Sequence, residues 1–338
     1  MVSDAVARHM ETVRELSKPG QALAKDAATA TTNNPAWWVG GEPTLSRDLL
    51  HERLIDEARA AAPDVEQQHR AIVLAGPPGA GKSTVLADVL GEHRGKYLVI
   101  DADEFKRSLL REAQADGSYD QWLMPDAIRE REAQGERFYP LELASLVHEE
   151  SSYLAKSLRA DAIAAGDNIV IDTVLSKQGE AVALGQLLSD AGYDVRVIDV
   201  EVPYELSEER IRGRWEHAYM RALEGGDSLG GRWVPSEYAR AVFDGPGGRS
   251  KPEAAARALA EQCPAVGRYR VFRTTVEEAR AADAEGRPAQ ATVEVDKSRS
   301  ARGAALVDTA LARTQQRAAV ARPTATDRGQ PSTGSERT

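Results

Sequence analysis

Residues 76–83 read Gly-Pro-Pro-Gly-Ala-Gly-Lys-Ser, which is the spacing of a phosphate-binding loop. An apolar run at 71–75 precedes the loop as a buried strand would, and residues 84–90 follow with the periodicity of a helix. Glycine allows backbone N–H groups to turn toward phosphates, and the start of the helix adds the positive end of its dipole. The motif therefore predicts a site for a nucleotide triphosphate between this strand and its helix.

Each residue type in the loop has an expected task. Lys82 is expected to reach the β- and γ-phosphates and the Ser83 hydroxyl to bind magnesium, with Thr84 as a less favoured substitute one residue outside the motif. A chance match in a glycine-rich loop is the alternative, and the flanking strand and helix argue against it. The expected nucleotide-binding set is Gly76, Pro77, Pro78, Gly79, Ala80, Gly81, Lys82, Ser83 and Thr84.

Charge and cysteine content restrict the class of protein. A net charge of −10 and a pI near 5.3 argue against a general nucleic-acid-binding surface, which needs a basic excess. The single cysteine, Cys263, excludes an internal disulfide and fits a reducing compartment. No run approaches the roughly 20 apolar residues that span a bilayer, and the first residues lack the pattern of a signal peptide. We expect a cytoplasmic protein without membrane contact.

Apolar strand patterns alternate with helical segments along the middle of the chain. Such alternation predicts parallel strands with helices on both faces. We therefore expect an α/β fold of the P-loop NTPase type, a three-layer α/β/α arrangement around a mostly parallel five-stranded sheet. The expected strands are residues 71–75, 97–100, 168–171, 195–200 and 269–272.

Composition divides the chain into three parts. Residues 1–65 predict a helical N-terminal extension, and residues 66–276 predict the P-loop domain, with an insertion at 109–140 that would form a flap beside the site. Residues 277–338 are rich in Ala, Arg, Glu, Thr and Ser, which predicts a low-complexity, largely disordered tail.

Two aspartates follow the second expected strand. Residues two apart in an extended chain project to the same side, so Asp101 and Asp103 would both face the crevice at the carboxyl ends of the strands. Phosphoryl transfer to an alcohol needs a carboxylate that receives the hydroxyl proton; Asp103 is the expected base, and Asp101 would orient magnesium. The alternative is that these aspartates cap the following helix at 104–111, and the two roles are compatible.

A further acid ends the third expected strand, Ile-Val-Ile-Asp at 169–172, and Thr173 follows it. Asp172 would contact magnesium through water or bind the acceptor of the phosphoryl group. The expected substrate-binding residues are therefore Asp103, Asp172 and Thr173.

Phosphoryl transfer also needs positive charge over the migrating group. One helical segment places four basic side chains on one face, at i, i+4, i+7 and i+11: Arg210, Arg214, His217 and Arg221. The glycine-rich stretch 225–231 then leads to Arg232, an arrangement typical of a closing lid. A solvated helix face is the favoured interpretation for Arg210, Arg212 and Arg221, with Arg212 paired to Glu216 four residues on.

The loop at 76–83 is accompanied by three further strings: Val-Ile-Asp-Ala-Asp-Glu-Phe-Lys at 99–106, Arg-Trp-Glu at 214–216 and Arg-Trp-Val-Pro at 232–235. Together they resemble the zeta toxin family, over about residues 71–273. Zeta toxins are the kinase halves of bacterial toxin–antitoxin systems, and they use ATP and magnesium to phosphorylate a hydroxyl of UDP-N-acetylglucosamine, which blocks cell-wall synthesis. The resemblance implies an ATP-dependent phosphotransferase that acts on an alcohol group of a nucleotide sugar.

The resemblance also implies roles for individual residues. Asp103 corresponds to the base, Lys82 and Ser83 hold phosphates and metal, and Arg214 and Arg232 stabilise the transferring phosphoryl group. ATP and Mg²⁺ are the implied ligands. The implied partner is an antitoxin protein that covers the ATP site with a helix.

Departures from the family lie where the sugar nucleotide would bind. The Glu-Gly-Thr string after the third strand is Asp-Thr-Val at 172–174 here, and Lys156 stands where an acidic residue is expected. The His-Pro pair of the family is replaced by Arg-Ser-Leu-Leu at 107–110. The residues for phosphoryl transfer are thus present while acceptor recognition is altered, and lost hydrogen-bond partners can change substrate discrimination by orders of magnitude.

Three alternatives to a zeta-type kinase are open. One is a small-molecule kinase that detoxifies an antibiotic, resembling chloramphenicol phosphotransferases. A second is a nucleic-acid end kinase, which the acidic balance disfavours. A third is a scaffold that binds ATP without turnover. We also hypothesise that a helix of the extension, at 2–16 or 49–61, covers part of the nucleotide cleft.

Overall fold

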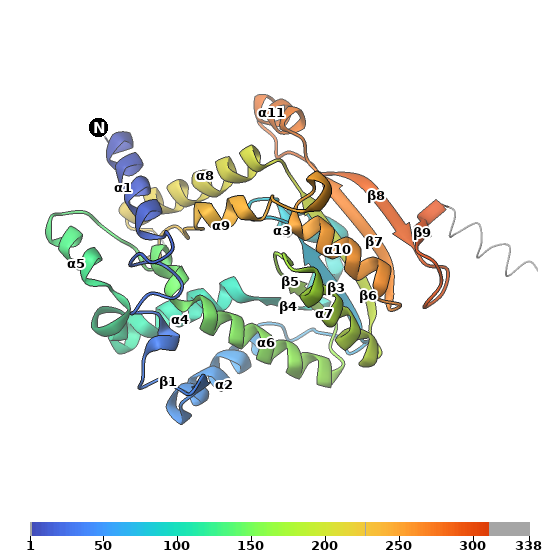
Figure 1. Ribbon diagram of the computed structural model, residues 1–338, viewed down its shortest axis with the longest axis horizontal. Helices are drawn as coiled ribbons and strands as arrows, with labels where there is room; N and C mark the ends of the chain where they lie inside the picture. The colour runs from blue at the N-terminus through green and yellow to red at the C-terminus, as the bar shows by residue number, and fades with distance from the viewer. Residues whose placement is uncertain (1, 227, 311–338) are drawn as a thin grey trace, which may run out of the picture.

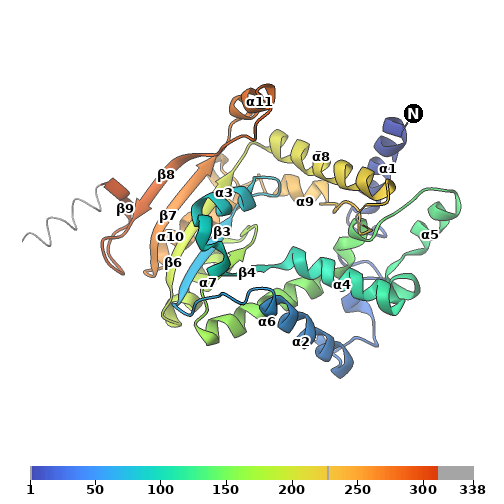
Figure 2. The same ribbon diagram turned by 180° about the vertical axis from the view of Figure 1, so that it is seen from behind.

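The structure, a computed structural model, describes residues 2–226 and 228–310 (Figure 1). Within them a seven-stranded sheet has the order β4-β5-β3-β6-β7-β8-β9. Helices cover both of its faces (Figure 2), which confirms the expected three-layer α/β/α fold. The parallel part consists of the five strands expected from the sequence: β3 (Arg70–Ala75), β4 (Leu98–Asp101), β5 (Ile169–Asp172), β6 (Asp194–Glu201) and β7 (Val266–Arg273).

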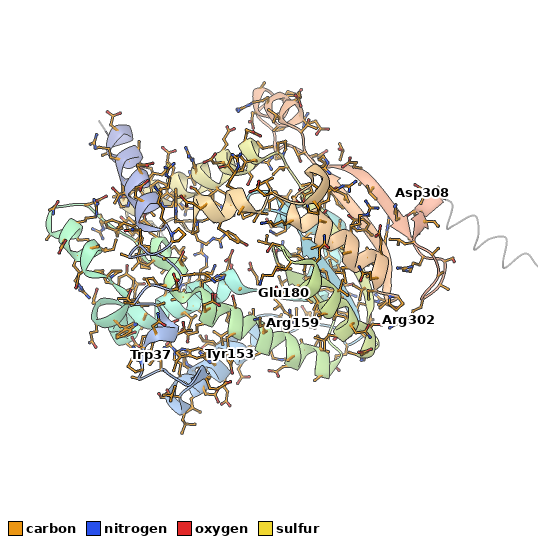
Figure 3. The ribbon with its side chains drawn as sticks, viewed as in Figure 1. Trp37, Tyr153, Arg159, Glu180, Arg302 and Asp308 are labelled. Atoms are coloured by element: carbon orange, nitrogen blue, oxygen red, sulfur yellow. The ribbon has the colours of Figure 1, made fainter. Side chains whose placement is uncertain are left out.

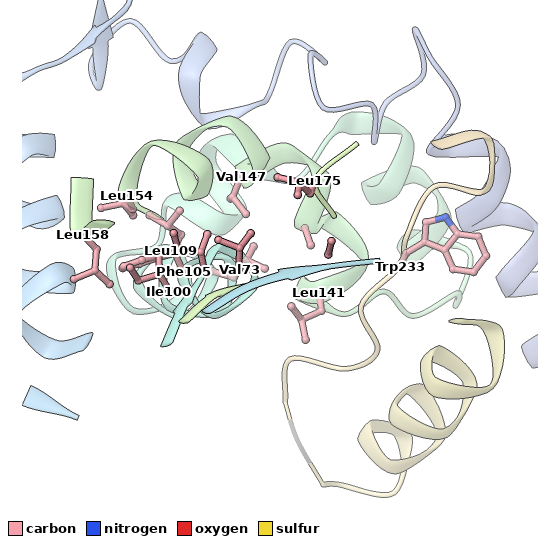
Figure 4. Packing of buried hydrophobic residues seen from close by; sticks show 14 of the residues in the cluster. Val73, Ile100, Phe105, Leu109, Leu141, Val147, Leu154, Leu158, Leu175 and Trp233 are labelled. Carbon is pink, nitrogen blue, oxygen red and sulfur yellow. The ribbon is translucent and has the colours of Figure 1, made fainter. Parts of the chain in front are cut away.

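Alternation along the central strand β3 sends its side chains into two separate cores. Ile72 and Leu74 pack toward α3 (Lys82–Leu90), whereas Val73 and Ala75 belong to the larger core on the opposite face. Figure 4 shows Val73 in the larger core among side chains from the covering helices. The helices of that face are α4 (Ala102–Asp116), α6 (His148–Ala165), α7 (Gln178–Asp190) and α10 (Lys251–Gln262).

The N-terminal extension is part of the larger core. Val13 and Leu23 from this segment are fully buried there. Glu150 of α6, also fully buried, accepts hydrogen bonds from Arg47 Nη2 at 2.9 Å and from His51 Nε2 at 2.7 Å. The elements of the extension are α1 (Val2–Leu16), the 3₁₀ turn η1 (Thr31–Asn33), a hairpin of β1 (Trp38–Val39) and β2 (Glu42–Pro43), and α2 (Leu45–Ala60).

Two consecutive tryptophans fasten the hairpin of the extension. The Trp38 ring meets Tyr153 of α6 edge to face, with the centroids 5.5 Å apart. The guanidinium carbon of Arg47 lies 4.2 Å from the centre of the Trp37 ring. Trp37 and Tyr153 mark this junction in Figure 3. The extension is therefore attached to α6 in two ways, by aromatic packing of its hairpin and by the polar contacts of α2.

The insertion at 109–140 is packed rather than a loose flap. Leu123 and Ile128 lie almost fully buried in the larger core. The expectation of a flap therefore needs correction, because these two apolar side chains anchor the segment. The insertion contains the end of α4, the π-helical turn η3 (Tyr119–Leu123) and α5 (Asp126–Ala133), and it leads to the 3₁₀ segment η4 (Pro140–Val147) before α6.

The C-terminal part extends the sheet further than the composition predicts. Beyond β6 the chain forms α8 (Tyr204–Leu223), α9 (Ser236–Ala241) and the 3₁₀ turn η5 (Pro246–Gly248), and beyond β7 it forms α11 (Val276–Ala284), β8 (Thr292–Ser298) and β9 (Val307–Asp308). Strand β8 pairs antiparallel with β7, and Asp296 accepts hydrogen bonds from Arg268 at 2.9 and 2.6 Å. The prediction that a disordered tail begins at residue 277 is therefore wrong, because α11, β8 and β9 lie beyond or across this position. Residues 311–338 lie outside the described part.

No helix among the described residues is both long enough and apolar enough to cross a membrane.

Candidate active site

The glycine-rich loop lies between the end of β3 and the start of α3. Its glycines have positive φ angles, 136° at Gly76, 73° at Gly79 and 93° at Gly81, a region that other residues rarely adopt. A Cβ on Gly76 would lie 2.2 Å from the carbonyl oxygen of Val200, and one on Gly79 would lie 2.8 Å from that of Ser207. The backbones of β6 and α8 thus require glycine here, and the resulting loop can surround an anion with N–H groups.

Lys82 begins α3 and turns its ammonium group back over the loop. Its Nζ donates to the Gly76 carbonyl oxygen at 3.2 Å and lies 3.8 Å from Asp172 Oδ1 at the end of β5. Ser83 and Thr84 follow in the exposed first turn of the helix. The structure therefore brings the lysine and a strand-end acid together and leaves two hydroxyl groups accessible at the N-terminus of α3.

Helix α8 holds the loop from its other side, a contact that the sequence interpretation missed. The Ser207 hydroxyl donates to the Pro78 carbonyl oxygen at 2.7 Å, and Arg210 Nη1 donates to the Gly79 carbonyl oxygen at 3.3 Å. The interpretation of Arg210 as a solvent-facing residue is therefore wrong. Ser207 and Arg210 are three residues apart and therefore share one helix face, but this spacing does not show that the face meets the loop.

The rest of the predicted cationic face of α8 turns largely to solvent. His217 and Arg221 are exposed, as expected for a solvated face. Arg212 Nη2 pairs with Glu208 Oε1 at 2.7 Å, four residues earlier, so the predicted pairing with Glu216 is wrong. Both carboxylates are one turn away from Arg212, and the spacing alone does not choose between them.

The ends of β4 and β5 bring two acids side by side, because Asp101 and Asp172 are register partners. Asp101 is also the N-cap of α4, since its Oδ1 accepts the backbone N–H of Asp103 at 2.8 Å. Asp103 thus lies in the first helical turn, and alternation along an extended strand is the wrong reason for its position. Burial, together with the charges of Asp103 and Asp172, raises the pKa of Asp101 to about 6.

Asp103 is held by cations from two different elements. Its Oδ1 lies 3.0 Å from Nζ of Lys106, one turn further along α4, and its Oδ2 forms an ion pair with Nη1 of Arg232. Burial favours the neutral acid, but Arg232 and Lys106 outweigh it and lower the pKa of Asp103 to about 2. Asp103 is therefore ionised at neutral pH and able to accept a proton.

Arg232 comes from the segment between α8 and α9, called here the lid segment (residues 228–235). Its neighbour Trp233 is buried and meets Trp215 of α8 edge to face, with ring centroids 5.8 Å apart. Arg214 is exposed, like His217 and Arg221; partial desolvation and the charge of Arg232 lower its pKa, while Asp103 acts on it in the opposite direction. The two predicted arginines therefore lie within electrostatic reach of each other and of Asp103.

Two residues expected near the acceptor have other surroundings. Thr173 Oγ1 accepts the N–H of Leu175 at 3.2 Å, and in the same loop the Val174 carbonyl oxygen accepts the N–H of Gly76 at 3.5 Å. Lys156 lies on the exposed face of α6. Thr173 thus shapes the loop that supports the start of the phosphate-binding loop.

The N-terminal helices lie away from the phosphate-binding loop. Helix α1 packs His9 against Tyr219 of α8, with ring centroids 4.7 Å apart, and α2 packs against α6 through Glu150. Both helices are remote from α3 in Figures 1 and 2. The arrangement therefore does not place either helix over the nucleotide cleft, contrary to the hypothesis from the sequence.

Fold and site together define a class of protein. A phosphate-binding loop follows the central strand β3 of a parallel sheet, an ionised carboxylate lies just after β4, two strands away in the sheet, and arginines from α8 and the lid segment approach it. These are the features of a P-loop kinase-like fold. The chain belongs to the zeta toxin family: the family model for zeta toxin matches residues 54–280, about two-thirds of the chain. The resemblance seen in the sequence is thereby confirmed.

Solved structures resemble the chain at low sequence identity. A crystal structure of AvrRxo1-ORF1:-ORF2 with ATP is 21% identical, with a TM-score of 0.49, and the match covers 81% of this chain and 73% of that chain. A structure from the PezAT chromosomal toxin–antitoxin system of Streptococcus pneumoniae is 16% identical, with a TM-score of 0.46, and covers 75% of this chain and 83% of that chain. A comparison with curated proteins found no match. Membership of the family therefore rests on the family model.

Proposed function

We propose that the protein is an ATP-dependent kinase of the zeta-toxin type, which transfers the γ-phosphate to a hydroxyl group of a small acceptor. The observation that carries the proposal is the ion pair between Asp103 and Arg232. It joins the candidate base on α4 to an arginine of the lid segment. The charge of Lys82 also lowers the pKa of Asp103, so the base and the phosphate-binding loop belong to one site.

The loop fits the triphosphate of ATP, because its glycines have positive φ angles and lie close to the backbones of β6 and α8, a conformation that lets backbone N–H groups turn toward a phosphate. Lys82 would hold the β- and γ-phosphates, and Ser83 and Asp101 would hold magnesium. The described residues contain no group of three or more His, Cys, Asp or Glu side chains that could hold a metal ion, which fits an ion that keeps mostly water and phosphate ligands. When bound, magnesium would neutralise charge on the phosphates.

Asp103 would act as the general base. Ionised at neutral pH, it accepts the proton of the acceptor hydroxyl while that oxygen bonds to the phosphoryl group. An acceptor hydroxyl bound to Oδ2 of Asp103 competes with Arg232 for this oxygen and frees the guanidinium group for the phosphoryl oxygens. Arg214 and Lys82 add positive charge at the same place, which offsets the negative charge of the transferred group.

For the acceptor we propose UDP-N-acetylglucosamine or a related nucleotide sugar, on the strength of family membership. A second candidate, a kinase for another small molecule, is favoured by the surroundings of two family positions. The Thr173 hydroxyl is engaged by the N–H of Leu175, and Lys156 is exposed where the family carries an acid. Both changes lie in the region that would recognise the acceptor.

We also propose that an antitoxin protein binds this chain. AvrRxo1-ORF1 was crystallised with AvrRxo1-ORF2, and PezAT is a toxin–antitoxin system. Membership of the zeta toxin family extends the expectation of such a partner to the present protein. ATP and nucleotide sugars are cytoplasmic metabolites, so the proposed reaction places the protein in the cytoplasm.

The proposal is tested by incubating purified protein with ATP, magnesium and UDP-N-acetylglucosamine and analysing the products by mass spectrometry. The expected result is a sugar nucleotide with one added phosphate, formed only when protein and ATP are both present. Transfer to a different metabolite in a screen of small alcohols would select the second candidate acceptor. ATP binding without transfer to any acceptor would contradict the kinase and leave the ATP-binding scaffold.

A further inference from the structure

We propose that His9, a buried residue of α1, is a positioning residue for the lid segment, and that through Glu142 it fixes this segment so that Arg232 meets Asp103. The inference rests on the proposed function for the task of Arg232 in the reaction. The contacts that carry it are independent of any reaction. They give the N-terminal extension a part in activity as well as in stability.

His9 lies between two carboxylates although it is only 4% exposed. Its Nδ1 is 2.7 Å from Glu136 Oε1, and its Nε2 is 3.0 Å from Glu142 Oε1. Ionised carboxylates only accept hydrogen bonds, so a ring protonated on both nitrogens satisfies the two partners together. One side chain of α1 thereby joins the loop after α5 to the start of η4.

Glu142 also accepts hydrogen bonds from two further groups. Its Oε2 accepts the backbone N–H of Tyr139 at 2.8 Å, and its Oε1 accepts Nε1–H of Trp215 at 3.1 Å. The carboxylate is therefore surrounded by three donors when His9 is included. Its side chain is fully buried, so each lost donor leaves polar atoms that water does not reach.

The lid segment rests on the residues that Glu142 fixes. The Leu141 N–H donates to the Leu229 carbonyl oxygen at 2.9 Å, and the Trp233 N–H donates to the Leu141 carbonyl oxygen at 3.4 Å. Leu141 and Trp233 are both visible in Figure 4. Arg232 lies between these two attachment points, so the backbone that carries it follows the position of η4.

Helix α8 is held by the same histidine. The His9 ring stacks on Tyr219, with centroids 4.7 Å apart and planes 29° apart, and lies 5.9 Å from the Trp215 ring. Trp215 directly follows Arg214 and meets Trp233 of the lid segment edge to face. His9 therefore contacts the helix of one proposed catalytic arginine and, through Glu142, supports the segment of the other.

The charges around His9 favour its protonated form. Burial alone would lower the pKa of His9, but Glu142 and Glu136 outweigh it and raise the pKa above its ordinary value. Glu136 is in turn paired with Arg131 Nη1 at 3.3 Å. Burial raises the pKa of Glu142 as well, while its hydrogen bond with His9 acts in the opposite direction. The link thus depends on contacts at both ring nitrogens, which a side chain with a single donor group cannot replace at both carboxyl groups.

The test compares three variants of the full chain with the wild type. His9→Gln keeps a donor for only one carboxylate, and Trp215→Phe removes the Nε1–H bond to Glu142 while keeping an aromatic ring. Val13→Ala is the control, because Val13 lies on the same helix and is fully buried but apolar. Two quantities are measured: hydrogen exchange of the backbone amides at 229–234, and the kcat and KM for ATP.

We expect His9→Gln and Trp215→Phe to speed exchange at 229–234 and to lower kcat by about tenfold to 100-fold, the range expected for misplaced catalytic groups. The KM for ATP should stay within about twofold, because Ser207 and Arg210, which hold the phosphate-binding loop, lie in the first turns of α8, away from the Trp215 and Tyr219 rings that His9 contacts. Val13→Ala should lower the melting temperature without either effect.

Exchange at 229–234 that matches the Val13→Ala control in both His9→Gln and Trp215→Phe would overturn the inference. Faster exchange with unchanged kcat in these variants would overturn it too, because the segment would then be held without consequence for the reaction. A wild type without turnover contradicts the proposed function instead, and in that case the exchange rates still decide whether His9 holds the segment.

Discussion

Asp101 and Asp103 are two residues apart and have opposite electrostatic surroundings. Burial and the neighbouring acids raise the pKa of Asp101 to about 6, whereas Arg232 and Lys106 overcome burial and lower the pKa of Asp103 to about 2. Divergent pKa values in neighbouring carboxyl groups are typical of sites in which the two have different tasks. Asp103, the more strongly ionised of the pair, is the one in contact with the lid segment.

At the scale of single residues, we expect kcat to be far more sensitive to the loss of Arg232 than to the loss of Arg212. Arg232→Ala removes the positive charge that lies beside Asp103 and that would face the transferred phosphoryl group. The value of kcat should therefore fall by roughly a thousandfold or more, as for other arginines that stabilise phosphoryl transfer. Affinity for ATP should change little. Steady-state kinetics check the first expectation and nucleotide titration the second. Arg212→Ala, which removes an arginine paired with Glu208, is the control and should retain wild-type kcat.

A buried acidic pair on β6 predicts how stability depends on pH. Burial and the charge of Glu201 raise the pKa of Asp199 well above its ordinary value, and burial raises the pKa of Glu201 to about 7. The folded state therefore keeps protons that the unfolded chain releases, so this pair costs stability as the pH rises from the ordinary carboxyl range through about 7.

Asp199→Asn removes one member of this pair. The variant should gain stability over the wild type, and the gain should be larger at about pH 8 than at about pH 5.5, by about 1 kcal/mol or more. Urea unfolding at the two pH values measures the difference. Asp194→Asn at the exposed start of β6 should show no such trend, and an equal gain at both pH values for Asp199→Asn would contradict the account.

At the scale of elements, α8 connects the two halves of the site. Its first turns hold the phosphate-binding loop through Ser207 and Arg210, and its middle holds the lid segment through Trp215. A sequence pattern shows the arginines of this helix but not which of them faces the loop. The partners of Ser207 and Arg210 are about 130 residues earlier in the chain, and only the folded sheet brings them together.

The lid segment packs so closely against Tyr139 that only glycine fits at position 230. Gly230 has a φ of 71°, and a Cβ there would lie 2.3 Å from Cβ of Tyr139. Gly230→Ala should therefore displace the segment, lowering kcat by about tenfold or more while leaving ATP binding intact. Gly225→Ala is a matched control: its φ is 85°, but a Cβ would meet no atom within 4 Å.

Both glycine substitutions place alanine at a positive φ, at a cost of about 1–2 kcal/mol in stability. Thermal unfolding measures that shared cost, and kinetics measure the separate effect on turnover. Equal kcat values for the two variants would show that close packing against Tyr139 is not needed for the reaction.

At the scale of the whole molecule, the extension and the P-loop domain share one core. Glu150 is the centre of their polar contact, because Arg47 and His51 both bond to its fully buried carboxylate. Glu150→Ala leaves these two partners without their acceptor and should lower the free energy of unfolding by about 3–5 kcal/mol. Its neighbour Glu149 is 47% exposed and pairs with Lys25. Glu149→Ala should therefore cost less than about 1 kcal/mol.

Urea unfolding of the two glutamate variants provides this comparison. A loss for Glu150→Ala as small as that for Glu149→Ala would mean that the extension is attached more weakly than its burial indicates. Deleting the extension would also remove Val13 and Leu23 from the core. We therefore expect a truncated chain to be less stable, with no more open nucleotide cleft than the full chain.

The sequence predicts the parallel sheet well, because buried strands are continuous apolar runs and the phosphate-binding loop marks the central one. It does not predict β8, because the sequence Thr-Val-Glu-Val-Asp-Lys-Ser is largely polar. This strand forms by pairing antiparallel with β7 at the end of the parallel part of the sheet. Motif and family resemblance predict roles for Lys82, Asp103 and Arg232. Glu142 and His9 could not be found, since their contact spans 133 residues and neither lies in a motif.

Single-turnover phosphoryl transfer decides whether Asp103 is the base of a kinase site. Asp103→Asn is compared with Glu104→Gln, a change in the exposed acid next to it. We expect Asp103→Asn to bind ATP normally but to transfer phosphate about 100-fold to 10,000-fold more slowly, and Glu104→Gln to match the wild type. Transfer by Asp103→Asn at the wild-type rate would show that Asp103 is not the base.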